Sequence, residues 1–141
     1  KEYIKSVLAN AKILSETLKN NGFKIYSGGT DTHLMLVDLR PFNVKGNLAA
    51  ESLSKANITC NKNGIPFDSE SPMITSGIRL GSQAATTRGF GLNEFKLIGE
   101  LITKTIKGLS ENPNDNSKVE NEVRNEVVDL CSNFPIYKHL R

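Results

Sequence analysis

The apolar residues of this chain repeat at helical spacing near both ends and at strand spacing in between, and this order constrains the fold most. An amphipathic helix is predicted over residues 4–18, where apolar residues recur three or four positions apart. Gly22 ends it, since glycine readily adopts the left-handed conformation that closes a helix. Similar repeats over residues 97–109 and 119–130 predict two later helices, the first capped by Asn93.

Short apolar segments between these helices are typical of strands. They are residues 23–27, 33–39, 57–60 and 76–81, with a short helix over 47–56. Pro41 ends the second strand because it has no N–H to donate to a sheet. The order helix, strand, strand, helix, strand, strand, helix, helix predicts an α+β fold, an α/β sandwich whose small, mostly antiparallel sheet is covered by helices.

Composition narrows the class of protein. With 141 residues and 38% hydrophobic content, the chain is one ordinary domain with a sizeable core. It has no apolar run of roughly 18 residues, so no membrane span is expected. The net charge of +3 is spread over interspersed charges of both signs, which argues against nucleic-acid binding. Because the chain begins with Lys1, we expect a piece of a longer protein, with residues 1–22 as a connecting helix and 23–141 as the domain proper.

Cysteine and histidine spacing gives no metal site. Cys60 and Cys131 lie far apart and belong to no CxxC pattern, so we expect two reduced thiols in a cytoplasmic protein. His33 and His139 are also isolated, and no metal-ligand spacing exists.

The segment from Asn61 to Phe90 is long, polar and rich in glycine, and Arg79 interrupts its most apolar part, "SGIRLG". An arginine within an apolar strand is costly unless its guanidinium finds an anion. Gly77 and Gly81 would let a ligand or a neighbouring backbone approach closely. Arg79 could therefore hold a substrate carboxylate. Equally, it could form a structural salt bridge or point to water from an edge strand.

Other candidates have weaker signals. Arg88 is expected to form a structural ion pair, and Gly28–Gly29 a tight turn rather than a phosphate cradle. Asp31 and His33 could form an acid–base pair, although a turn cap and a strand entrance fit them better. In the loop, Asn63 and Ser71 could hydrogen-bond a heteroaromatic ring beside an apolar wall from Pro66, Phe67 and Pro72; a merely solvated connection would be unusually long. No nucleophile–base pair or paired carboxylates are evident.

Three stretches together resemble a known family. "SGGTDTHLMLVDLR", "ANITCNKNGIPFDSESPMITSGIRLGSQAATTRGF" and "VVDLCSNFPIY" resemble the C-terminal domain of serine hydroxymethyltransferase. That family consists of pyridoxal 5'-phosphate (PLP) enzymes of the aspartate-aminotransferase fold, fold type I. The resemblance covers essentially the whole chain, and the ordered motif is highly specific.

The resemblance implies a function. The family interconverts L-serine and tetrahydrofolate with glycine and 5,10-methylenetetrahydrofolate, as a homodimer. It implies that Arg79 binds the substrate carboxylate and that Asn63, Ser71, Pro72 and Met73 contact the folate. Met73 replaces the usual phenylalanine, which an apolar contact tolerates.

Two departures limit what the chain can do alone. Thr32 stands where the family has asparagine, which leaves a role for that side chain open. More importantly, the family's Schiff-base lysine, which follows a run of threonines, is missing. The chain thus resembles the last third or so of the enzyme and is expected to be inactive alone, forming one wall of an active site. The alternative is a stand-alone small-molecule-binding or interaction module.

Overall fold

A computed structural model describes residues 1–26 and 33–135 of the chain. The helices are α1 (Glu2–Asn20), α2 (Gly46–Lys55), α3 (Gln83–Arg88), α4 (Leu92–Glu111) and α5 (Ser117–Ser132), with a short 3-10 helix, η1, over Arg40–Phe42. The strands are β1 (Lys24–Tyr26), β2 (Leu34–Asp38), β3 (Asn61–Asn63) and β4 (Gly77–Gly81). The predicted order of long helices and strands is confirmed, except that the third strand is β3, at the start of the segment predicted as a loop, and not residues 57–60. The elements η1 and α3 are additional.

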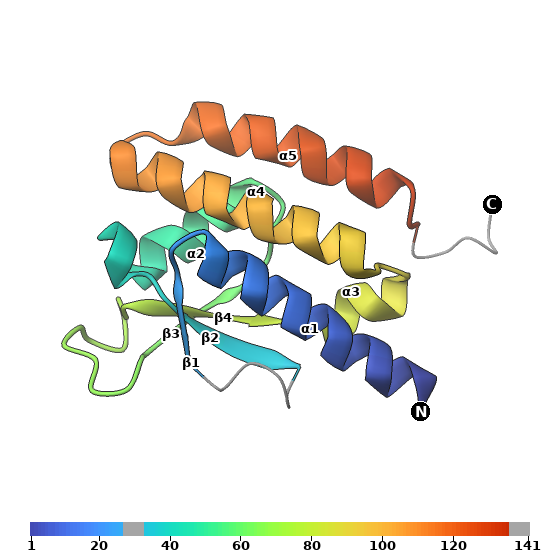
Figure 1. Cartoon of the computed structure of the whole chain (residues 1–141). Coiled ribbons are helices and arrows are strands. Elements are labelled where there is room, and N and C mark those ends of the chain that lie inside the picture. The colour runs from blue at the N-terminus through green and yellow to red at the C-terminus, as the bar shows by residue number, and fades with distance from the viewer. Residues whose placement is uncertain (27–32, 136–141) are drawn as a thin grey trace.

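The strands form one sheet in the order β1-β2-β4-β3, and every neighbouring pair is antiparallel. The predicted α+β class is therefore confirmed. Figure 1 shows the helices gathered on one side of this sheet, with α4 and α5 farthest from it. The side chains that alternate toward the helices are almost fully buried, namely Met35, Val37, Ile78 and Leu80. The opposite face of the sheet, which we call the outer face, is covered by none of the helices of the described residues (Figure 1).

Helix α1 is part of the core. Ala11, Leu14 and Leu18 are at most 2% exposed, and α1 packs along α4 (Figure 1). The two helices approach closely at Gly99, where a Cβ atom would lie 2.8 Å from a side-chain carbon of Thr17. The buried side chains of this helix therefore pack against the core of this chain. The predicted boundary between residues 22 and 23 stays a prediction.

Two local predictions are corrected. Residues 57–60 are not a strand, because Asn57 has a φ of 67° and the Ile58 N–H donates to the Leu53 carbonyl at 2.8 Å. Ile58 is apolar because it closes the end of α2 against the core. Asn93 does not cap α4 either: Gly91 is the N-cap, and its N–H donates to Glu94 Oε1 at 3.0 Å. Among the described residues, no helix is long and apolar enough to cross a membrane.

Candidate outer-face site

Arg79 projects from the outer face of the sheet. It pairs with Leu36 on one side and Asn61 on the other, so β4 is an inner strand of the sheet rather than the edge strand that one alternative required. The side chain is exposed and forms no hydrogen bond or ion pair within the described part of the chain. The structural salt bridge is therefore excluded for those residues. The guanidinium remains available to an anion from outside.

The glycine two residues earlier serves the sheet itself. A Cβ atom on Gly77 would lie 2.8 Å from the Val37 carbonyl oxygen and 2.9 Å from that of Asn63. Any side chain would push apart the strands on both sides of β4. Of the two roles predicted for this glycine, close approach of a neighbouring backbone is the one realised here.

Asn63 shares the outer face with Arg79. It pairs with Gly77 in the β3–β4 ladder, and residues 77 and 79 point to the same face. Its side chain is half-buried, and Nδ2 donates to the Gly64 carbonyl at 2.9 Å. Asn61 completes a polar strip on β3 beside Arg79.

The other predicted folate residues lie on the loop over residues 64–76. Ser71, Pro72 and Met73 are all exposed, with Met73 at 74%. Phe67 is fully exposed and has a φ of 56°. After Met73 the loop is fastened to the start of α2, because the carbonyls of residues 74 and 75 accept N–H groups of residues 47 and 46 at 2.9 and 3.0 Å. The loop therefore presents apolar and polar side chains to the outside on a fastened backbone.

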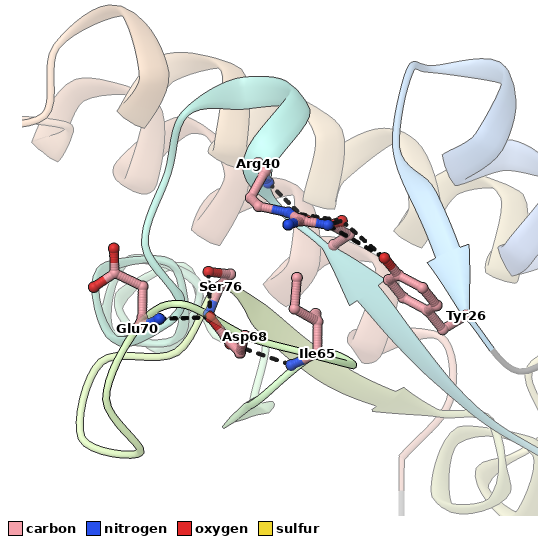
Figure 2. Close-up of polar contacts among 7 residues, drawn as sticks. Tyr26, Arg40, Ile65, Asp68, Glu70 and Ser76 are labelled. Atoms are coloured by element: carbon pink, nitrogen blue, oxygen red, sulfur yellow. Dashed lines mark hydrogen bonds and ion pairs between the residues drawn. The ribbon is translucent and has the colours of Figure 1, made fainter.

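Asp68 organises this loop and was not predicted. Its carboxylate accepts hydrogen bonds from Ile65 N, Glu70 N, Ser76 N and Ser76 Oγ (Figure 2). Burial opposes ionisation, but these hydrogen bonds outweigh it and lower the pKa of Asp68 to about 2. An Asp a few residues before a Ser is too common a pattern to have revealed this contact from sequence.

A second carboxylate that the sequence analysis did not single out is that of Asp38, at the end of β2. Asp38 is 1% exposed, and both its oxygens accept from Arg40, with Nη2 to Oδ2 at 2.7 Å. Arg40 Nη2 also donates to Tyr26 Oη at 3.2 Å, as Figure 2 shows. Burial opposes ionisation of Asp38, but the Arg40 hydrogen bonds and charge hold the pKa of the carboxyl below its ordinary value. This arginine is neutralised, in contrast to Arg79.

A cavity of about 690 Å³ opens beside Arg79 at the end of β4. Both cysteines line it, and burial raises the pKa of the Cys60 thiol to about 11. Arg88 lines it too, but donates to the backbone carbonyls of Cys131 and Phe134. Within residues 1–26 and 33–135 the predicted ion pair of Arg88 is therefore not found, and hydrogen bonds to the backbone take its place.

The remaining predictions concern metals and the turn before β2. The described residues hold no group of three or more His, Cys, Asp or Glu side chains suited to a metal ion. Gly28, Gly29, Asp31, Thr32 and His139 lie outside the described residues. The backbone carbonyl of His33 accepts the N–H of Ser82 at 3.0 Å, so this residue sits at the strand entrance.

Comparison with known proteins identifies the family. The family model described as Serine hydroxymethyltransferase matches residues 1–102. Similar proteins include a serine hydroxymethyltransferase of Pelagibacter ubique, 86% identical over the whole chain, which covers 32% of that protein. Another is serine hydroxymethyltransferase 3 of Colwellia psychrerythraea, 60% identical over 96% of the chain and 31% of the relative. The chain thus spans about a third of the length of these relatives. On this evidence it belongs to the serine hydroxymethyltransferase family.

Proposed function

We propose that this chain supplies the substrate-carboxylate arginine and part of the folate site of a serine hydroxymethyltransferase. The complete protein would interconvert L-serine and tetrahydrofolate with glycine and 5,10-methylenetetrahydrofolate. Arg79 carries the proposal, because it is an exposed guanidinium on a strand held from both sides, with no partner in the described part of the chain. Its planar fork suits a carboxylate, and such charge-assisted hydrogen bonds contribute roughly 1.5–3 kcal/mol each.

The role of Arg79 would be to bind and orient. Holding the carboxylate fixes how the amino acid lies at the reacting centre, and binding energy gained there can be used for orientation. Asn63, Ser71, Pro72 and Met73 would contact tetrahydrofolate from the same side. Their supporting observations are the shared outer face of Asn63 and Arg79 and the exposure of the loop.

The cofactor of the family, PLP, does not fit this chain by itself. The lysine pattern that would hold its aldehyde is missing from the sequence, and the role proposed for Arg79 is to bind the amino-acid substrate. PLP would supply its carbanion-stabilising chemistry from the remainder of the protein. The proposed assembly is a cytoplasmic homodimer.

The test is an activity assay on the full-length protein that contains this chain. Purified with PLP, it should form glycine from L-serine only when tetrahydrofolate is present, and analytical ultracentrifugation should give a dimer. Binding of serine without any formation of glycine, with or without tetrahydrofolate, would favour a small-molecule-binding module instead.

A further inference from the structure

The carboxylate of Asp68 accepts four hydrogen bonds, all from donors of its own loop. Oδ2 accepts from Ile65 N at 3.2 Å and from Ser76 N at 2.8 Å. Oδ1 accepts from Glu70 N at 2.9 Å and from Ser76 Oγ at 2.7 Å. One side chain therefore joins the beginning, the middle and the end of the loop, as Figure 2 shows.

These donors flank the residues proposed to contact folate. Glu70 immediately precedes Ser71, and Ser76 follows Met73 by three positions. The side chains of Ser71, Pro72 and Met73 are exposed, so apolar packing does little to fix them. The loop is also supported by the hydrogen bonds of residues 74 and 75 to α2 and by a turn in which their N–H groups donate to the Ser71 carbonyl at 3.0 and 2.9 Å. The surface ion pair of Glu70 with Lys45 adds little, as is usual for such pairs.

Arg79 is fixed by different interactions. Its strand is paired with β2 over the whole of β4 and with β3 over residues 77–79. These ladders do not involve the Asp68 carboxylate. A change at Asp68 should therefore move the loop more than it moves the guanidinium.

We propose that Asp68 is a positioning residue for tetrahydrofolate, which holds the loop so that Ser71 to Met73 reach the folate. The inference rests on the proposed function. Asp68 acts through the loop, since its two oxygens are taken up by loop donors. A carboxylate suits this task because it only accepts, whereas an asparagine of the same shape would turn an NH₂ group toward N–H donors.

The experiment compares D68N, S76A and D115N in the full-length, PLP-loaded enzyme. Asp115 is a matched control, because it also accepts from a serine N–H and hydroxyl, at 3.1 and 2.7 Å, but lies in the turn just before α5. D68N should raise the KM for tetrahydrofolate about tenfold or more, since small displacements in a binding site are costly. The KM for serine, and the Kd for glycine measured without folate, should stay within about twofold. D115N should change none of these.

S76A removes a single donor of the four and should raise the folate KM by less than D68N. It also keeps the test decisive if D68N fails to fold. Equal increases in the serine and folate constants would mean that Asp68 is merely structural, and an unchanged folate KM in both variants would also overturn the inference. A wild-type enzyme without folate-dependent turnover would instead refute the proposed function, and this inference with it.

Discussion

Arg79 on β4 and Asn61 on β3 lie directly opposite each other, and both belong to the outer face of the sheet. Leu36 is the opposing residue on β2. Neither neighbour bears a charge, so nothing in the ladder neutralises the guanidinium. By contrast, Arg40 on the same side of the molecule is neutralised by Asp38. This difference supports the proposal that Arg79 binds a carboxylate, whereas Arg40 forms an ion pair within the chain.

The first prediction concerns this arginine in the full-length enzyme. R79A should lower kcat/KM for serine by about 10²- to 10⁴-fold, because two charge-assisted hydrogen bonds of roughly 1.5–3 kcal/mol each are lost together. R79K should recover only part of this, since a point charge replaces a fork. PLP content, read from absorbance, should stay unchanged. Steady-state kinetics with varied serine measure the effect.

The matched control is R124A, which removes an exposed arginine from α5. It should leave kcat/KM unchanged. If R79A unfolds the protein while its soluble fraction retains normal serine kinetics, Arg79 is structural and the carboxylate assignment is wrong.

The second prediction tests whether α1 belongs to the folding unit. The 141-residue chain should unfold cooperatively, and L18A should lower its free energy of unfolding by about 2–5 kcal/mol, because Leu18 is fully buried against the core. I4A, on the same helix but 61% exposed, should change it by less than about 0.5 kcal/mol. Urea titrations monitored by circular dichroism measure the free energy of unfolding of both variants. If L18A destabilised the chain no more than I4A, α1 would not be part of the folding unit.

The third prediction is a pH dependence of stability. Burial opposes ionisation of Asp68, yet its hydrogen bonds lower the pKa from 3.8 to about 2 in the folded protein. The carboxylate therefore stabilises the fold fully above about pH 5, and this contribution is lost as the pH falls through 4 toward 2. The gap in unfolding free energy between wild type and D68N should be constant at neutral pH and narrow in acid. A gap that is the same at about pH 7 and pH 3 would contradict this.

Periodicity predicted the long helices and three of the strands because burial on one face imposes it. The prediction of a strand at 57–60 was wrong for a related reason. Ile58 is buried, but at the end of a helix, and apolar character alone does not distinguish a buried strand from a buried helix end. The predicted cap of α4 was wrong because Gly91 is the N-cap and no N-cap side chain is used; instead, the Glu94 side chain accepts the Gly91 N–H.

At the site, the sequence singled out Arg79 through the cost of a charge in an apolar strand. It could not reveal Asp68, whose partners lie up to eight residues away and depend on how the loop turns back. Nor could it show that Asp38 pairs with Arg40, because this contact forms where β2 ends at Asp38 and the chain turns into η1, and the sequence does not fix that turn.

The fourth prediction concerns Cys60. Burial raises the pKa of its thiol from 9.0 to about 11, so its thiolate fraction at pH 8 is about a hundredfold lower than that of an unburied thiol. Iodoacetamide should therefore modify Cys60 far more slowly in the native chain than in urea. Mass spectrometry of the digested protein gives the rate at each cysteine. Similar rates in both conditions would mean that the thiol is not buried in solution.

The last prediction is that the 141-residue chain alone neither binds PLP stably nor converts serine to glycine. The reason is chemical: covalent attachment of PLP in this family needs a lysine within a motif that this sequence lacks. The role proposed for Arg79 is to bind the carboxylate of the amino-acid substrate, which does not replace that lysine. Equilibrium dialysis against PLP, followed by a glycine assay with tetrahydrofolate, measures both properties. The full-length enzyme, assayed in parallel, is the positive control. Turnover by the isolated chain would mean that its own residues hold PLP and carry out the reaction. The proposal that this chain only contributes substrate-binding residues, while the remainder of the protein holds PLP, would then be wrong.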